Sequence, residues 1–278
     1  KANFSAPIND MKTFNGGAAA NVALVGANLG LKTSLVSAVG GDFKKSNYYE
    51  IMESLDVDTD SLIIVPGETS PTAFVLTDEN DDQISYFYWG AAKEFASSKV
   101  PKNAISNVQA VHLATGDPHF NWKCSEEAKR QELLVSFDPG QDLGMYDTDK
   151  LRDVITNTTI LFGNHYEIER ILESLEVDLD GLREIGPKII VKTCGANGSE
   201  IYSNNDKIKV DAIVREAVDP TGAGDSYRAG FLSRFLNGES LEQSAKFASS
   251  VSSFIVEEQG CQTNMPTFDD AFDRMSEF

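Results

Sequence analysis

The pattern of apolar and polar positions divides most of the chain into short apolar runs separated by amphipathic segments. The apolar runs are continuous and of strand length, whereas residues 43–55, 122–131 and 165–175 have helical periodicity. Continuous apolar strands separated by helices are typical of a parallel sheet covered on both faces. The pattern therefore predicts an α/β fold with a mostly parallel central sheet. The expected strands are residues 34–39, 108–114, 133–138, 159–162 and 188–193.

Two regions interrupt this alternation and predict a second, smaller sheet. Residues 5–14, 62–65, 72–78 and 83–89 have strand character without helices between them, and the polar residues 79–82 predict a hairpin turn. Aromatic residues at the end of the hairpin would cover an apolar surface. That surface could belong to a dimer partner, to a substrate cleft that the lid closes, or to the main core. The expected division is a core domain of residues 15–60 and 90–278 and a β lid of residues 1–14 and 61–89.

Polar residues follow the ends of three of the expected strands. Asp117 comes shortly after the strand at 108–114, Asp138 ends the next strand, and Asn164 follows the third. In open parallel sheets, ligands bind outside the carboxyl ends of the strands. We therefore expect these three side chains to lie at one edge of the sheet, beside a ligand site.

A glycine-rich turn leads directly into an expected helix at residues 226–237. Gly222, Ala223 and Gly224 have little or no side chain, so their backbone N–H groups can approach an anion at the positive end of the helix dipole. Asp225 follows at once and adds a carboxylate that can accept a proton. Phosphoryl transfer to an alcohol needs both features. Taken alone, the same residues are equally compatible with a simple glycine turn capped by an aspartate.

A second glycine pair, Gly16 and Gly17, precedes an expected helix that Gly30 terminates. Asn21, one turn into that helix, can hydrogen-bond a polyol, although tight packing of a helix rich in small residues explains the pattern as well. The third glycine of a GxGxxG dinucleotide fingerprint is missing. The sequence also has no Gly-Lys dipeptide, which excludes a Walker-type phosphate loop.

Composition and charge limit the partners of the protein. The 278 residues include 43 acidic and 24 basic side chains, and the formal charge is −19. Such a surface repels nucleic-acid phosphates and anionic membranes, so we expect neither as a partner. The three cysteines form no CxxC pair, which indicates neither a disulfide framework nor a zinc site. No apolar run approaches the roughly 18 residues of a membrane span, and we expect a cytoplasmic protein.

The two glycine motifs, Asp225 and the small lid together resemble the ribokinase (PfkB) family of carbohydrate and nucleoside kinases. The likeness extends from about Asn15 to Thr267. Asn164-His165-Tyr166-Glu167 is similar to the Asn-x-x-Glu motif of the family, and residues 192–198 are similar to its nucleotide-binding loop. Within the family, five phrases look most like archaeal nucleoside kinases of broad specificity: GAAAN (17–21), ATGDP (114–118), FDPGQD (137–142), DSYRAG (225–230) and GCQTN (260–264).

The resemblance implies a three-layer ribokinase-like fold and ATP-dependent phosphorylation of the 5'-hydroxyl of a nucleoside. Asp225 would be the general base, and the turn before it would bind the transferring phosphoryl group. The resemblance also implies Mg²⁺ held through water by Glu167 and Asn164, and a K⁺ ion near Asp219 as in some relatives. The substrate-binding residues would be Gly16, Gly17, Asn21, Asp117, Asp138 and Gln141. The ATP-binding residues would be Asn164, Lys192, Gly195, Asn197, Gly198, Thr221 and Gly260.

Two alternatives to a nucleoside kinase stay open at this point. A kinase of a free sugar or a sugar phosphate would share the fold, but a sugar-phosphate kinase needs extra cations, and only Lys123 lies near the expected acceptor site. A binding protein without activity would also share the fold, but would not need Asp225, Asn164 and Glu167.

Two further expectations concern the lid, the first from the resemblance and the second from the residues of the lid itself. Family members begin with a core strand that ends near a sugar-binding Asp, and we expect both to be lacking here, because the chain starts in the lid. The exposed face of the lid would carry alternate members of an aromatic cluster, which predicts a homodimer through the lids. That cluster is Tyr86, Phe87, Tyr88 and Trp89.

Overall fold

The computed structural model describes residues 7–78, 83–203 and 206–278. Its largest element is a six-stranded sheet in the order β10-β9-β8-β7-β6-β5. Strands β5 to β8 run parallel, and β9 and β10 continue the sheet as antiparallel neighbours. The mostly parallel sheet expected from the apolar runs is confirmed, but the run at 34–39 does not belong to it. Its strands are β5 (Ala110–Leu113), β6 (Leu134–Phe137), β7 (Ile160–Asn164), β8 (Ile189–Thr193), β9 (Ser199–Ser203) and β10 (Asp206–Val210).

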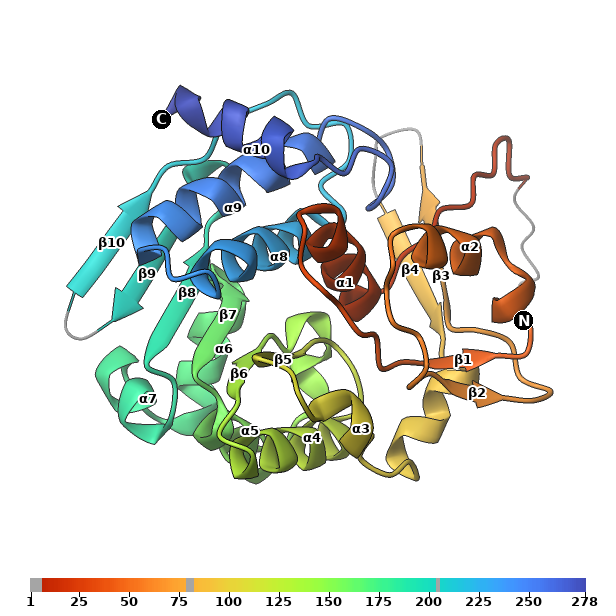
Figure 1. Ribbon diagram of the computed structural model, residues 1–278, viewed down its shortest axis with the longest axis horizontal. Coiled ribbons are helices and arrows are strands. Elements are labelled where there is room, and N and C mark those ends of the chain that lie inside the picture. The colour runs from red at the N-terminus through yellow and green to blue at the C-terminus, as the bar shows by residue number, and fades with distance from the viewer. Residues whose placement is uncertain (1–6, 79–82, 204–205) are drawn as a thin grey trace, which may run out of the picture.

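Helices cover both faces of this sheet (Figure 1). Because neighbouring residues of a strand point to opposite faces, Leu161 and Ile190 pack beneath α4, α5 and α6, whereas Phe162 and Val191 pack beneath α8. The two cores produce the expected three layers. The first face carries α4 (Pro118–Arg130), α5 (Thr148–Asn157), α6 (His165–Leu175) and α7 (Leu179–Ile185). The second carries α8 (Ala223–Phe235) and α9 (Leu241–Ile255), against which α1 (Ala18–Asn28) and α10 (Phe268–Arg274) pack.

Two helices begin earlier than their periodicity indicates, because local caps extend them. The helix α4 begins at Pro118, where the Asp117 side chain accepts the Phe120 N–H over 2.8 Å and proline suits the first turn. The helix α8 begins directly after Gly222, whose φ of 82° places it in the left-handed region. Asp225 therefore lies in the first turn of α8. Among the helices of the described segments, none is long and apolar enough to cross a bilayer.

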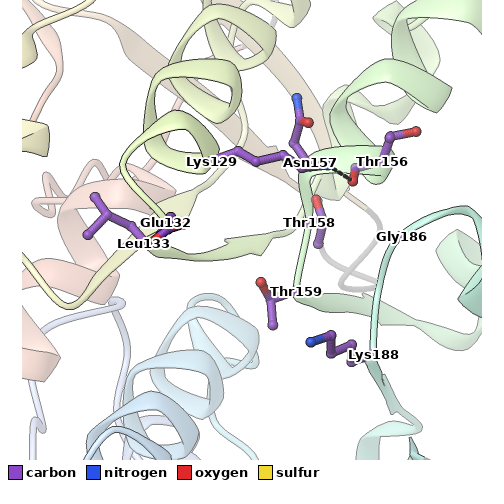
Figure 2. A pocket seen from close by; sticks show the side chains of 9 residues that line it. All are labelled: Lys129, Glu132, Leu133, Thr156, Asn157, Thr158, Thr159, Gly186 and Lys188. Atoms are coloured by element: carbon purple, nitrogen blue, oxygen red, sulfur yellow. Dashed lines mark hydrogen bonds between the residues drawn. The ribbon is translucent and has the colours of Figure 1, made fainter.

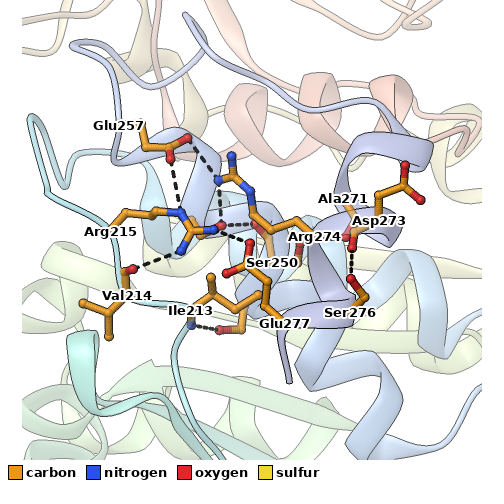
Figure 3. A network of polar contacts seen from close by, with 12 residues as sticks. Ile213, Val214, Arg215, Ser250, Glu257, Ala271, Asp273, Arg274, Ser276 and Glu277 are labelled. Carbon is orange, nitrogen blue, oxygen red and sulfur yellow. Dashed lines mark hydrogen bonds and ion pairs between the residues drawn. The ribbon is translucent and has the colours of Figure 1, made fainter.

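A polar network holds the C-terminal helix against the segment that leads to the glycine turn (Figure 3). Glu257 accepts from Arg215 over 3.3 Å and from Arg274 over 3.0 Å. The Arg274 guanidinium also lies 3.2 Å from the centre of the Phe254 ring. Close by, the Val256 carbonyl accepts the Val218 N–H over 2.7 Å. The end of α9 and the approach to the glycine turn are thus fixed together.

The smaller strands differ from the expected lid in two ways. The strand β2 (Ile63–Val65) pairs in parallel with β1 (Ala38–Gly40), so the run at 62–65 is a strand but does not join the hairpin. Residues 7–14 form no strand, which corrects the expectation for 5–14; residues 5 and 6 lie outside the described part. Pro7 and Asp10 in this segment both disfavour strand pairing. The shorter helices are α2 (Asn47–Ser54) and α3 (Lys102–Ile105), with 3-10 turns at Phe43–Lys45, Gly90–Ala96, Gly140–Met145, Gly195–Asn197 and Met275–Glu277.

The expected hairpin is present as β3 (Thr72–Thr77) and β4 (Gln83–Tyr88), which pair antiparallel. Its expected turn, residues 79–82, lies outside the described residues. In Figure 1 the hairpin stands apart from the six-stranded sheet. Strand alternation gathers large apolar side chains on one of its faces. These are Phe74, Leu76, Ile84, Tyr86 and Tyr88, between 44% and 60% exposed.

Candidate active site

The glycine turn is shaped by contacts on both sides. A Cβ atom added at Gly222 would lie 2.7 Å from the Cβ of Cys261, so no larger residue fits there. Asp219 braces the turn, because its carboxylate accepts the Thr221 N–H over 2.9 Å and the Gly260 N–H over 3.0 Å. The Ala223 N–H donates to the Pro220 carbonyl over 3.2 Å. Within the described chain, the N–H groups of Gly222 and Gly224 have no acceptor, as expected of an anion site.

Asp225 is tied to the early glycine motif by a hydrogen bond. Asn21 Nδ2 donates to Asp225 Oδ2 over 2.7 Å, although the two residues are 204 positions apart. Gln262 Nε2 donates to Asn21 Oδ1 over 2.7 Å and to the Tyr48 hydroxyl over the same distance. The Tyr48 hydroxyl donates to the Gly16 carbonyl over 3.0 Å. The fold therefore brings together Gly16, Asn21 and Asp225.

A buried arginine connects Asp225 to the end of β6. The Arg228 Nε forms a close ion pair with Asp138 Oδ2, and its Nη1 lies 4.0 Å from Asp225 Oδ1. Asp138 also accepts the Gly140 N–H over 3.0 Å. Burial opposes the charged form of Arg228, but the carboxylates of Asp138, Asp225 and Glu167 outweigh it and raise its pKa. Arg228 therefore stays charged in this cluster.

Burial has the largest effect on the acidity of Asp225. It raises the pKa of Asp225 to about 6, while the Arg228 charge and the Asn21 hydrogen bond act in the opposite direction. A carboxylate with this pKa is ionised at neutral pH and is a stronger base than an ordinary aspartate. Its acidity suits a general base near the operating pH.

Asn164 and Glu167 form a capping box at the start of α6. Asn164 Oδ1 accepts the Glu167 N–H over 2.9 Å, and Glu167 Oε2 accepts the Asn164 N–H over 2.7 Å. Burial raises the pKa of Glu167, and the neighbouring Asp138 carboxyl raises it further. The end of β7 thus places a second carboxylate near the Asp138–Arg228 pair.

The expected ATP-binding loop is the tight connection between β8 and β9. A Cβ at Gly198, whose φ is 83°, would lie 2.0 Å from the Val210 carbonyl oxygen, so only glycine fits. Near this connection, the Tyr227 hydroxyl of α8 donates to Ser199 Oγ over 2.7 Å. Lys192 Nζ lies 2.6 Å from Glu200 Oε2 on the neighbouring strand, so its charge is already paired. The remaining expected residues of the loop, Gly195 and Asn197, lie in the turn that follows β8.

Two expected substrate residues lie outside the hydrogen-bonded cluster around Asp225. The Asp117 side chain caps α4, as described above. Gln141 is exposed in the 3-10 turn that follows β6. Gly17, by contrast, is the N-cap residue of α1, with a φ of 105°.

Three residues of this cluster escaped the sequence analysis as site residues. The sequence could have indicated Arg228, because it follows Asp225 by three positions and residues at that spacing share one face of a helix. Tyr48 and Gln262 carry no comparable signal. Gln262 reaches both Asn21 and Tyr48 only because the loop after α9 folds back over α1 and α2.

Two cavities differ in their position relative to this cluster. One, of about 400 Å³, is lined by Gln262 and residues that follow it, by residues that directly precede Gly16, and by residues of α2; among them are Phe14, Asn47 and Met265. The other, of about 240 Å³, is seen in Figure 2 and is lined by residues that directly precede β6, β7 and β8. It therefore lies at the end of the strands opposite to Asp138 and Asn164. Only the first cavity adjoins the candidate site.

The fold and this arrangement of carboxylate, anion turn and buried arginine define a phosphotransferase that acts on a hydroxyl group. The sequence model of the pfkB family carbohydrate kinases matches residues 4–268, and the chain belongs to that family.

Individual relatives agree with this assignment. The chain is 57% identical over 274 residues to a nucleoside kinase of Methanothermobacter thermautotrophicus, covering 99% of this chain and 88% of the relative. It is 42% identical to a nucleoside kinase of Methanocaldococcus jannaschii, covering 98% and 89%. The crystal structure of Methanocaldococcus jannaschii nucleoside kinase, an archaeal member of the ribokinase family, superposes with a TM-score of 0.95. That match is 41% identical and covers 100% of this chain and 92% of the other. The ribokinase-like fold expected from the sequence is confirmed.

Proposed function

We propose that the chain is an ATP-dependent nucleoside kinase that phosphorylates the 5'-hydroxyl of its substrate. The observation that carries this proposal is the position of Asp225. Its largely buried carboxylate lies in the first turn of α8, directly after a turn whose backbone N–H groups suit a phosphoryl group. The archaeal relatives named above, at 57% and 42% identity, support a nucleoside as the acceptor.

In the proposed reaction, Asp225 accepts the proton of the substrate hydroxyl as the hydroxyl oxygen attacks the γ-phosphoryl group of ATP. The backbone N–H groups of Gly222 and Gly224 stabilise the charge on that group, with Ala223 completing the turn. Asn21 and Arg228 keep Asp225 oriented and ionised. The bond that breaks joins the γ-phosphorus to the bridging oxygen of ATP, and ADP is the leaving group.

We propose that the early glycine motif holds the ribose and that the connection after β8 holds ATP. Asn21 contacts Asp225, and Gly16 and Gly17 directly precede the helix that carries Asn21, so a ribose held by them would have its hydroxyl next to the base. Asp138 is held by Arg228 and Gly140, so its main contribution is to position Arg228. Further substrate contacts would come from Asp117 and Gln141. The ATP side would comprise Asn164, Lys192, Gly195, Asn197, Gly198, Thr221 and Gly260.

The residues at the end of β7 fit a Mg²⁺ ion that accompanies ATP. Glu167 uses only its Oε2 in the capping box, so its other oxygen can accept from a metal-bound water. Mg²⁺ prefers oxygen ligands and keeps several waters, which agrees with one carboxylate rather than a cage of protein ligands. When bound, the ion neutralises phosphate charge, and Glu167 and Asn164 would orient its waters.

We propose that Asp219 serves mainly to brace the glycine turn. Each of its oxygens already accepts a backbone N–H, from Thr221 and from Gly260. A K⁺ ion beside Asp219 would have to share these oxygens, so the structure favours the bracing role.

A panel of acceptors tests the proposed activity. ATP consumption would be measured with purine and pyrimidine nucleosides, with ribose and with fructose 6-phosphate at equal concentrations. We expect kcat/KM for the best nucleoside to exceed that for ribose and for fructose 6-phosphate by at least about tenfold, since base contacts add binding energy. A preference for either sugar would contradict the nucleoside assignment and support a sugar kinase.

We further propose a homodimer in which two hairpins pack face to face. One face of the hairpin carries the exposed cluster of Phe74, Leu76, Ile84, Tyr86 and Tyr88, and a patch of this kind normally marks an interface. A two-stranded sheet also needs a partner surface to be stable. The cluster includes aromatic residues, and aromatic residues at the centre of an interface often dominate its binding energy.

The mass of the protein in solution tests the dimer. By light scattering at micromolar concentration, we expect about twice the chain mass of 30.3 kDa. Tyr86→Glu should return the mass to that of one chain, because it places a charge in the centre of the face. Tyr166→Glu, a control on the exposed surface of α6, should leave the mass unchanged. A wild-type mass of a single chain would reject the dimer.

A further inference from the structure

Five residues form one chain of hydrogen bonds that ends on the proposed base. The Tyr48 hydroxyl donates to the Gly16 carbonyl over 3.0 Å. Gln262 Nε2 donates over 2.7 Å to the Tyr48 hydroxyl oxygen and over 2.7 Å to Asn21 Oδ1. Asn21 Nδ2 in turn donates over 2.7 Å to Asp225 Oδ2. The chain thus links a backbone carbonyl to a carboxylate through three side chains.

The direction of every hydrogen bond in this series follows from the Gly16 carbonyl at its start. A backbone carbonyl can only accept, so the Tyr48 proton points to Gly16 and the Tyr48 oxygen is left to accept. Gln262 must therefore present its NH₂ group, which bonds to both Tyr48 and Asn21. Asn21 then accepts with its oxygen and presents its NH₂ group to Asp225. A reversed Asn21 amide would set its oxygen against the Asp225 carboxylate, which is repulsive.

The Gln262 amide is held by its donor end alone. Its Oε1 is buried and has no donor among the residues that the structure describes. An unpaired buried carbonyl is unfavourable, so the Oε1 end does not explain the orientation of this side chain. The orientation is explained by the two acceptors, Tyr48 and Asn21, that share the NH₂ group.

We propose that Gln262 is a positioning residue that fixes the orientation of the Asn21 amide and so favours the ionised, proton-accepting form of Asp225. The proposal rests on the proposed function, in which Asp225 is the base. The physical link is the Asn21 hydrogen bond, which stabilises the carboxylate relative to the carboxylic acid. Burial acts in the opposite direction and raises the pKa of Asp225 to about 6.

Other groups also act on the charge of Asp225. Arg228, one helical turn away, favours the carboxylate, and Asp138 at the end of β6 opposes it. Burial raises the pKa of the Tyr48 hydroxyl, so this residue stays neutral throughout the working range of pH. The remaining groups that interact with Asp225 are Glu167 of α6 and Cys261 of the loop after α9. Within the described chain, Tyr48 alone among these groups hydrogen-bonds to Gln262. A substitution at Gln262 therefore acts on Asp225 mainly through Asn21.

The pH dependence of kcat in a Gln262→Met variant tests the proposal. Methionine has nearly the length of glutamine but no N–H donor. With ATP and the best nucleoside of the panel, we expect the wild-type rate to fall as the pH drops through about 6. In the variant this acid limb should move up by about 0.5–1 pH unit, the equivalent of one ordinary hydrogen bond. The fold change in KM should be smaller than the fold change in acid dissociation constant that corresponds to the shift of the limb.

Gln259→Met is the matched control, because Gln259 lies in the same loop but its side chain accepts from Lys12 at the exposed surface. Its acid limb should coincide with that of wild type. An unshifted or downward-shifted limb in Gln262→Met would overturn the role of Gln262, while an inactive Asp225→Asn would leave the base assignment standing. If Gln262→Met does not fold, Tyr48→Phe decides in its place. That variant removes the group that fixes the chain's direction, so an unshifted limb there would also overturn the proposal.

Discussion

Asp225→Asn is expected to lower kcat by at least about a hundredfold, because the amide cannot accept the proton of the attacking hydroxyl. Asparagine has the shape of aspartate and keeps an oxygen that can accept from Asn21. The melting temperature and the affinity for ATP should therefore stay close to those of wild type. Steady-state kinetics, thermal melting and ATP titration on the same preparation measure the three quantities.

The pH profile separates a missing base from a distorted site. The wild-type rate should decline below pH about 6, where the Asp225 carboxylate becomes protonated. The residual rate of Asp225→Asn should lack this limb. Asp211→Asn, which neutralises an exposed carboxylate, is the control and should keep both the rate and the limb. Wild-type turnover in Asp225→Asn would remove Asp225 from the role of base.

Arg228→Met is expected to produce the largest loss of stability among single substitutions in the site. Arg228 and Asp138 are 8% and 6% exposed in their side chains, and the substitution leaves the Asp138 carboxylate buried without its partner. Breaking a buried pair in this way costs about 3–5 kcal/mol. For a chain of this size, that loss lowers the melting temperature by roughly 6–20 °C. Calorimetry or thermal melting followed by circular dichroism measures it.

The loss of stability in Arg228→Met should increase as the pH rises. Without Arg228, the folded-state pKa values of Asp138 and Asp225 rise further above their unfolded values, so the native state binds more protons than the unfolded state. Stability then falls as the pH rises, and the deficit relative to wild type should be larger at pH 8 than at pH 5. Lys209→Met removes one partner of the exposed Lys209–Asp211 pair and should change the melting temperature little. A deficit as small as that of Lys209→Met would contradict the buried charge cluster.

The sequence predicts the architecture well because periodicity and capping are local. The runs at 108–114, 133–138, 159–162 and 188–193 all become strands of one sheet, since continuous apolar segments can be buried only between two layers of helices. The N-terminal segment at 7–14 is the main error. Its composition allows a strand, but pairing depends on an available neighbour, which a local pattern does not specify.

The candidate site is predictable to the extent that its chemistry lies in contiguous motifs. Asp225 with its glycine turn and the Asn164–Glu167 capping box are readable along the chain. The Gln262–Asn21 contact is not, because it joins residues 241 positions apart through the fold of a loop. Spacing alone also cannot say that the Lys192 ammonium is already paired with Glu200 across two strands.

The position of the phosphoryl group in the product tests the central claim most directly. Purified protein would be incubated with ATP, Mg²⁺ and the best nucleoside of the panel, and the product analysed by phosphorus–proton correlation NMR. Asp225 and the glycine turn can serve a single hydroxyl at a time, so we expect one nucleoside monophosphate and stoichiometric ADP. Its phosphorus should couple to the two 5' protons of the ribose. Coupling to the 2' or 3' proton, or ADP release without any phosphorylated nucleoside, would contradict the account.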